Sequence, residues 1–166
     1  LVGWKLIFDL RERLLDTVIG LAQGRLEGQH IAMVNKYSSG LPTFPGDPNQ
    51  LRQVFSNLIA NAVQATEDLP ANERRILVRT GMELGEDGTR LRVDICDNGR
   101  GIDHTEAARL FEPFYTTSHQ GSGLGLYIVA QLCELNNASV SARINQYKGA
   151  SFILRMTSTA TDKDNQ

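Results

Sequence analysis

The clearest helical pattern in the sequence begins at Asp47-Pro48, where a carboxylate can cap a first turn and a proline suits its first position. The apolar positions that follow recur with a period near 3.6 residues, which predicts an amphipathic helix with one buried face. We expect this helix to end between Asp68 and Asn72, where the period stops. Its apolar stripe consists of Leu51, Val54, Phe55, Leu58, Ile59, Ala62 and Leu69.

Weaker apolar periods predict one helix before this one and one after it. Asp9 can cap the first, which runs to about Gly24. The second begins at Leu124 and runs to about Asn137. The apolar face is Leu10, Leu14, Val18 and Leu21 in the first helix, and Leu126, Ile128, Val129, Leu132 and Leu135 in the second.

Runs of alternating or continuous apolar residues predict strands at 30–36, 75–80, 90–97, 140–145 and 150–156. Short glycine-containing turns join the second strand to the third and the fourth to the fifth, as in β-hairpins. Residues 38–46 carry two prolines and two glycines, so we expect a loop there. The order of elements predicts an α+β two-layer sandwich, in which a mixed β-sheet is covered on one face by helices.

The length of 166 residues fits one domain with a sizeable core. We assign 1–156 to this domain, with an N-terminal helix, strand and loop in 1–46 and the candidate functional motifs in 47–156. Residues 157–166 are expected to form a polar C-terminal tail. Because the chain opens at Leu1, it can be a piece of a longer protein, whose membrane anchors or sensor regions would then lie outside it.

Charge and cysteine content argue against several classes of function. Seventeen Lys and Arg stand against 19 Asp and Glu, a net charge of −2, and no basic run supports nucleic-acid or membrane-surface binding. No apolar run reaches the length that spans a membrane. Cys96 and Cys133 have neither metal-ligand spacing nor a disulfide framework. The three histidines are scattered and form no triad with a serine and an aspartate.

The motif Asp97-Asn98-Gly99-Arg100-Gly101 follows directly on a predicted strand. Its glycines permit a ligand to approach the backbone closely, and Asp97 could accept a hydrogen bond from an amino group such as that of adenine. The same residues could equally form an Asx-turn that ends the strand. The motif alone leaves both interpretations open.

A second glycine-rich motif, Gly121-Ser122-Gly123-Leu124-Gly125, precedes the last predicted helix. Its backbone N–H groups and the helix N-terminus could form a cradle for phosphate oxygens. No lysine follows it, so it is not a P-loop. The alternative is a flexible connector, although Leu124 and Leu126 argue against a simple linker.

Asn57 and Asn61 lie one turn apart at the edge of the apolar stripe that follows Asp47. An amide oxygen is an acceptable Mg²⁺ ligand when phosphates supply the negative charge. Surface helices also commonly carry such residues. A metal-binding role for these two residues therefore depends on the glycine-rich motifs forming a nucleotide site.

Together these motifs resemble the catalytic, ATP-binding domain of two-component sensor histidine kinases, in the gyrase/Hsp90/histidine-kinase/MutL superfamily. The stretch 57–62 resembles the N box of that family, 97–101 its G1 box, 111–114 its F box and 121–126 its G2 box. The four boxes cover about Asp47 to Ser151 in the family's order, and the Asn-Ala-Val-Gln-Ala that begins at Asn61 is similar to the nitrogen-regulation-type branch. The resemblance implies the Bergerat α/β sandwich and a single ATP-binding catalytic domain over 1–156.

The resemblance also implies a role for each box in binding ATP and Mg²⁺. Asn61 would bind the Mg²⁺ that bridges the phosphates and Asn57 would position the phosphate end, which makes these two the catalytic residues. Asp97 would recognise the adenine amino group, with help through water from Ser151. The adenine pocket would be shaped by Gly99, Gly101 and Ile102. A lid over 102–120, which carries Thr116 and Thr117, would be anchored by Phe111 and Phe114. The triphosphate would be wrapped by Gly121, Ser122, Gly123, Leu124, Gly125 and Leu126.

Partners follow from the same resemblance. Family members phosphorylate a histidine of a preceding dimerisation domain, and none of His30, His104 and His119 has the required sequence context. The acceptor would therefore lie on a dimerisation and histidine-phosphotransfer domain outside this chain, with a response-regulator receiver domain acting downstream. We expect the chain itself to be monomeric and cytoplasmic, without contact to nucleic acid or membrane, while a parent protein could be membrane-anchored.

Departures from the family pattern bear on affinity and chemistry. Gln64 and Ser118-His119 stand where many members carry lysines, which leaves the phosphate charge to Mg²⁺ and backbone amides and predicts a modest ATP affinity. ATPases of the superfamily have a glutamate base where this chain has Asn57. An amide cannot take a proton from water, so ATP hydrolysis should be slow and transfer to histidine preferred.

Three alternatives stay open on the sequence alone. The first is an ATPase of the topoisomerase, chaperone or mismatch-repair type, against which Asn57 and the F box count. The second is an anti-sigma-factor-type serine kinase of the same fold, which usually lacks the Phe-x-Pro-Phe motif. The third is a degenerate domain that acts only as a regulatory nucleotide-binding module, against which the completeness of the boxes counts.

Overall fold

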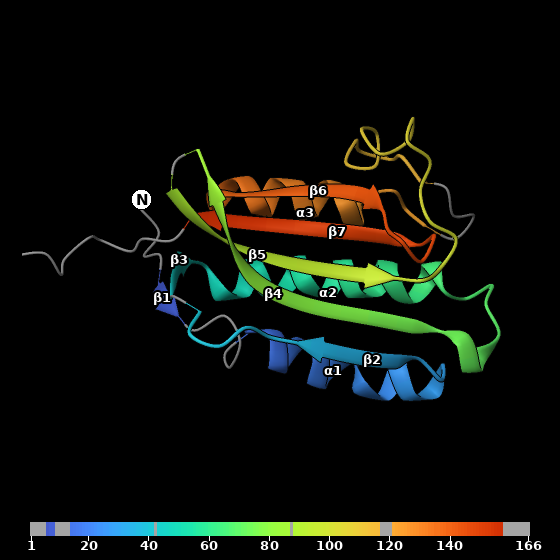
Figure 1. Cartoon of the computed structure of the whole chain (residues 1–166). Coiled ribbons are helices and arrows are strands. Elements are labelled where there is room, and N and C mark those ends of the chain that lie inside the picture. The colour runs from blue at the N-terminus through green and yellow to red at the C-terminus, as the bar shows by residue number, and fades with distance from the viewer. Residues whose placement is uncertain (1–5, 9–13, 42, 87, 117–120, 158–166) are drawn as a thin grey trace, which may run out of the picture.

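The protein folds around a five-stranded mixed sheet with three helices on one of its faces (Figure 1). The computed structural model describes residues 6–8, 14–41, 43–86, 88–116 and 121–157. The strand order is β2-β4-β5-β7-β6, in which β2 runs parallel to β4 and the other pairs are antiparallel. The bounds are β2 Ala32–Lys36, β4 Arg75–Gly85, β5 Gly88–Asp97, β6 Ala138–Ile144 and β7 Ala150–Thr157. The predicted α+β sandwich with a mixed sheet is confirmed.

A small second sheet was not predicted. It pairs β1 (Leu6–Phe8) with β3 (Phe44–Gly46) in antiparallel register, so the expected loop over 38–46 ends in a strand. Three residues that include a proline and a glycine carry no strand period of their own. Only a pairing partner far away in the sequence makes β3 a strand.

Helix α1 (Asp16–Gly28) is displaced along the sequence from the helix expected between Asp9 and Gly24. The proposed cap at Asp9 and its neighbour Leu10 lie outside the described residues. Leu14 and Val18 are buried as expected, but Leu21 is 75% exposed and Leu26 is buried in its place. The inclusion of Leu21 in the buried face was therefore wrong. Four glycines and alanines in the helix weaken the apolar period from which the face was inferred.

Helix α2 (Pro48–Ala65) begins as predicted, because Asp47 accepts hydrogen bonds from the backbone N–H groups of Asn49 (2.8 Å) and Gln50 (3.3 Å). Its apolar stripe packs on the sheet at the centre of the core. The helix ends at Ala65, earlier than expected, and Leu69 lies beyond it and is only partly buried.

Helix α3 (Gly125–Leu135) runs antiparallel to α2 and is tied to it by Asn136. The Asn136 side chain accepts from the backbone N–H of Asp47 (2.8 Å) and donates to the side-chain oxygen of Gln50 (2.8 Å) and the carbonyl of Leu132 (2.8 Å). This buried amide joins the start of α2 to the end of α3. The start of α3 at Gly125 lies beside the middle of α2, where the Asn57 side chain donates to the Gly125 carbonyl.

We predict that Asn136→Ala lowers the free energy of unfolding by about 1–3 kcal/mol, because it leaves the buried N–H of Asp47 without its acceptor. Urea unfolding followed by circular dichroism measures the change. Leu135→Ala is the matched control, since Leu135 is 60% exposed and its truncation should cost no more than about 0.5 kcal/mol. Equal effects of the two substitutions would contradict the structural role of Asn136.

Candidate functional site

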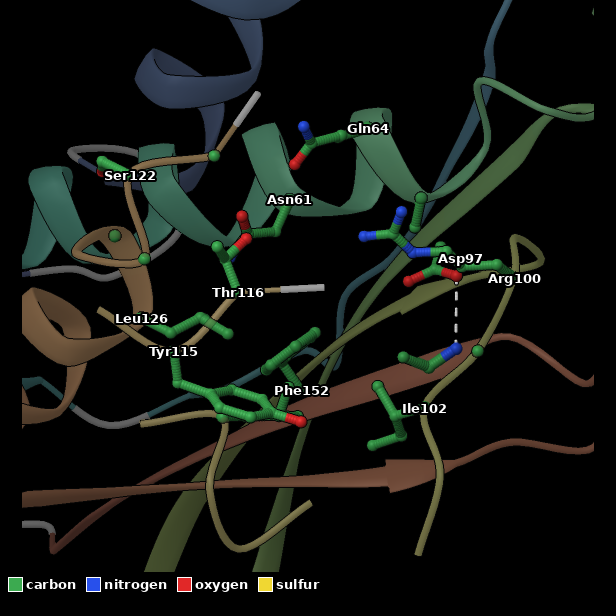
Figure 2. Close-up of a pocket in the computed structure, with 17 residues that line it drawn as sticks. Asn61, Gln64, Asp97, Arg100, Ile102, Tyr115, Thr116, Ser122, Leu126 and Phe152 are labelled. Atoms are coloured by element: carbon green, nitrogen blue, oxygen red, sulfur yellow. Dashed lines mark hydrogen bonds between the residues drawn. The ribbon is translucent and has the colours of Figure 1, made fainter. Parts of the chain in front are cut away.

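A pocket lies between the second half of α2, the end of β5, the start of β7 and the segment that leads into α3. Figure 2 shows Asn61 and Gln64 entering it from α2, Asp97 from the end of β5, and Phe152 from β7. The antiparallel pairing of β5 with β7 brings the last two together, because Cys96 is paired with Ser151. The N-box, G1 and G2 residues, which are far apart in the sequence, thus line one cavity.

Asp97 is the most constrained polar group in the pocket. Its Oδ1 accepts hydrogen bonds from the backbone N–H groups of Gly99 (2.9 Å) and Ala150 (3.2 Å). Its Oδ2 is buried and has no hydrogen-bond partner among the residues that the structure describes. A buried carboxylate oxygen without a donor costs free energy, which makes it a site where a ligand donor would be favoured.

Burial also raises the pKa of the Asp97 carboxyl above its ordinary value, and the hydrogen bonds from Ala150 and Gly99 offset only part of that effect. The two interpretations of the Asp97 motif are therefore both correct in part. The bond between Oδ1 and the N–H of Gly99 is that of an Asx-turn. The other oxygen remains available for a ligand.

Close backbone contacts hold the Asp97 loop in place. The N–H of Arg100 donates to the carbonyl of Ala65 at the end of α2 (3.1 Å), and a Cβ at Gly99 would collide with that same carbonyl. Gly99 therefore permits the loop to pack against α2 and does not itself line the pocket. Gly101 does line the pocket, as predicted.

One wall of the pocket is apolar and suits a flat ring. It contains Ile102, which was predicted, together with Tyr115 and Phe152, which were not (Figure 2). Phe111 packs edge-on against Phe152 with ring centroids 6.4 Å apart, so it supports the wall from behind. Nothing in the local sequence marked Phe152 as a site residue, because it is one of several apolar residues in a core strand.

The glycine-rich segment before α3 forms the opposite end of the pocket. Gly121, Ser122, Gly123, Gly125 and Leu126 line it as predicted, whereas Leu124 is the residue that precedes the helix and does not line the pocket. Gly123 has a φ of +71° and its carbonyl accepts from the N–H of Phe114 (2.9 Å). The N-terminus of α3 therefore faces this end of the cavity with its backbone dipole.

The two asparagines of the N box have different positions. Asn61 lines the pocket, and its side-chain Nδ2 is buried without a hydrogen-bond partner. Asn57, one turn earlier, is not in the lining but donates to the carbonyl of Gly125 (3.4 Å). Asn57 thus positions the first residue of α3, and Asn61 faces the cavity. Gln64 also lines it, one turn beyond Asn61.

The prediction for Ser151 was wrong. Successive residues of a strand face opposite sides of a sheet, and the pocket is lined by Ala150 and Phe152. Ser151 therefore lies on the other side, where its hydroxyl donates to the Sγ of Cys96 (3.1 Å). The error was one of strand register, which the local sequence does not reveal.

The predicted anchoring role of Phe114 also needs correction. Its side chain is 74% exposed, and its backbone has a φ of +64°. The residue holds the lid through its N–H bond to Gly123, not through packing of its ring. Thr116 lines the pocket as predicted, while Thr117 lies outside the described residues.

The donor set of the pocket fits Mg²⁺ only as part of a nucleotide complex. Among the described residues no group of three or more His, Cys, Asp or Glu is arranged to hold a metal ion. The wall of the pocket formed by α2 offers the neutral amides of Asn61 and Gln64. Oxygens of a bound phosphate would have to supply the negative charge that a divalent cation requires.

The described part of the chain contains no helix with the length and apolar character that crossing a membrane requires.

Comparisons with known proteins agree with this geometry. The family described as histidine kinase-, DNA gyrase B-, and HSP90-like ATPase matches residues 46–160. Sensor protein TorS of Escherichia coli (strain K12) is 33% identical over 146 residues, which cover 86% of this chain and 15% of that protein. Sensory histidine kinase/phosphatase NtrB of Rhizobium leguminosarum bv. phaseoli is 35% identical over 147 residues, 78% of this chain and 38% of NtrB.

A solved structure of full-length ShkA in complex with AMPPNP superposes with a TM-score of 0.77 at 31% identity, covering 92% of this chain and 30% of that one. The chain thus spans well under half the length of each of these relatives. Family match, fold and pocket geometry agree: this chain belongs to the histidine kinase-, DNA gyrase B- and HSP90-like ATPase family, and its relatives there are sensor histidine kinases.

Proposed function

We propose that the pocket binds ATP with Mg²⁺ and that the chain is the catalytic domain from which the γ-phosphate passes to a histidine of a separate domain. The observation that carries the proposal is the buried, unpartnered Oδ2 of Asp97 at one end of a cavity whose other end is the N-terminus of α3. An acceptor for an amino group and a cradle for phosphates occur together in one pocket. The nucleotide analogue in the ShkA structure supports this assignment.

The adenine base would be recognised through one hydrogen bond and through contact with the apolar wall of the pocket. The exocyclic amine of adenine is a donor, which Oδ2 of Asp97 could accept without moving, because Oδ1 is held by two backbone N–H groups. The ring would lie against Ile102, Tyr115 and Phe152. Guanine presents a carbonyl at the corresponding position, so this arrangement favours adenine.

The phosphate end would be bound by backbone amides and by Mg²⁺. Gly121, Ser122 and Gly123 present backbone at the N-terminus of α3, where the helix dipole favours anions. Asn61 would contribute its amide oxygen to a Mg²⁺ shared with the phosphates. The ion would neutralise phosphate charge and polarise the γ-phosphoryl group.

Transfer would proceed by in-line attack of an imidazole nitrogen on the γ-phosphorus. The bond from that phosphorus to the bridging oxygen breaks, ADP leaves, and the histidine gains the phosphoryl group. This chain would contribute mainly positioning and charge stabilisation. The Asn57 amide contacts Gly125 and cannot act as a base towards water, which supports transfer over hydrolysis.

The acceptor histidine is proposed to lie on a dimerisation domain of the same protein, with a response-regulator receiver domain as the next acceptor. A solved complex of the histidine kinase ThkA with the response regulator TrrA supports this kind of partner. We propose a cytoplasmic site of action, where ATP and such a receiver would both be available.

Asp97→Asn should weaken binding of AMPPNP by about 10- to 100-fold, because the substitution presents an amide donor to the adenine amine in place of an acceptor. Isothermal titration calorimetry measures the loss. Ser151→Ala is the matched control on the same pair of strands, and it should leave the affinity unchanged, since Ser151 faces away from the pocket. Unchanged affinity in Asp97→Asn would show that Asp97 is not the adenine contact.

The same substitution should not destabilise the fold at neutral pH. Because the pKa of the Asp97 carboxyl is raised in the folded protein, the folded state holds this proton more tightly than the unfolded chain does. The stabilisation that protonated Asp97 gives is therefore complete below the unfolded pKa and is lost as the pH rises through the folded pKa. Ionisation of the buried carboxyl is a free-energy cost that asparagine removes. The melting temperature of Asp97→Asn at neutral pH should equal or exceed that of the parent, which separates lost binding from lost folding.

Binding of AMPPNP should also depend on Mg²⁺ through Asn61. Removing Mg²⁺ with EDTA should weaken binding to the parent about tenfold, and the Asn61→Ala variant should show a much smaller difference between the two conditions. Among the described residues the Nδ2 of Asn61 has no hydrogen-bond partner, so its removal breaks no hydrogen bond that this atom donates. No heat with or without Mg²⁺ would refute the ATP proposal, and a full Mg²⁺ effect in Asn61→Ala would refute the ligand assignment.

A further inference from the structure

The face of the sheet opposite the helices carries a strong excess of positive charge. In the described part of the chain no helix covers this face (Figure 1). Successive side chains of a strand point to opposite faces of the sheet. Cys96 of β5 and Ser151 of β7 point to this face, away from the pocket. Every second residue from these two does the same, and so do the residues paired with them in β2, β4 and β6. Its cationic residues are Lys36, Arg75, Arg79, Arg90, Arg92, Arg143 and Arg155, and its anionic ones are Asp94 and Glu83. The whole chain, in contrast, has a net charge of −2.

Two carboxylates organise the centre of this basic face. Asp94 is 2% exposed and accepts from Arg79 and Arg92, while Glu83 accepts from Arg92 and Arg155. Burial opposes ionisation of Asp94, but the hydrogen bonds from Arg92 and Arg79 outweigh it and lower its pKa. The three guanidinium groups are therefore held in fixed positions, which reduces the entropy that a partner would have to remove on binding.

The charge of the basic face is not balanced by these two carboxylates. Lys36, Arg75 and Arg143 lie at its margins, where the strand pairings bring no further acidic residue beside them on this face. A local excess of one sign on a protein of opposite net charge favours a partner of complementary charge.

A hollow at one edge of the basic face adds an apolar contact. Its apolar lining includes Val34, Leu77 and Tyr147, and its polar lining consists of Lys36, Arg75, Asp97 and Asn98. Val34 is 43% and Tyr147 58% exposed, so both side chains are accessible to a partner. The hollow could receive one apolar side chain while the surrounding cations contact carboxylates.

We propose that the basic face docks an acidic protein surface, which places one apolar side chain in the hollow between Val34 and Tyr147. A nucleic acid fits less well, because Tyr147 is the one aromatic residue among the described residues of the hollow and no stacking platform exists there. An anionic membrane also fits less well, because the described residues of this face form no protruding apolar ridge.

The test uses the 166-residue chain and a fluorescein-labelled peptide in which glutamates flank a single leucine. Fluorescence anisotropy should show binding that weakens with added salt. Arg143→Glu and Lys36→Glu should each weaken it about fivefold, and replacing the leucine of the peptide with serine should weaken it by a similar factor. Arg25→Glu on α1 makes the same change of charge on the helical side and should have no effect.

AMPPNP titration of each variant confirms that the pocket, and hence the fold, is intact. The proposal is overturned if the peptide does not bind, or if Arg25→Glu weakens it as much as Arg143→Glu does. It is also overturned if single-stranded DNA or phosphatidylserine vesicles bind more tightly than the peptide with the same dependence on Arg143. Salt-sensitive self-association that Arg143→Glu abolishes would place a second copy of the chain on this face and refute an acidic partner.

Discussion

A buried carboxylate with one satisfied and one open oxygen is the constraint on which the site depends. The backbone at Gly99 and Ala150 fixes Oδ1 of Asp97, and this places Oδ2 at a defined point on the pocket wall. Burial raises the pKa of the carboxyl, so its ionised form costs more free energy in the folded protein than in the unfolded chain. A free-energy cost of this kind is common where a site is preorganised for a ligand and not for stability.

The remaining elements serve to keep the two ends of the pocket at a fixed separation. Asn136 ties the start of α2 to the end of α3, and Asn57 touches Gly125 at the other end of the same pair. The loop of Asp97 is in turn fastened to the end of α2 through the carbonyl of Ala65. Helix, loop and strand therefore form one rigid frame, in which the glycine-rich segment before α3 is joined to the lid through Phe114.

The errors of the sequence interpretation share a physical origin. The family resemblance placed Ser151 beside the adenine site, but the alternation of side chains along β7 turns it to the opposite face of the sheet. The same alternation brings cations from separate strands together on that face. Because these cations are far apart in the sequence, they form no basic run that could have predicted the patch. Leu21 and Leu135 were placed on buried helix faces and Phe114 was expected to anchor the lid, but all three side chains are exposed. Apolar character does not by itself specify which side chains meet the core.

Strong local signals were enough to predict the capped helix from Pro48 and the hairpin strands from the sequence. They were also enough to identify Asp97, Asn61 and the glycine-rich boxes as candidate site residues. These depend on period, capping and backbone freedom, which act over a few residues. Tertiary structure alone decided that β3 is a strand, that Tyr115 and Phe152 form the wall, and that one oxygen of Asp97 is left open. Each of these depends on which distant segments meet, and a local pattern carries no information about that.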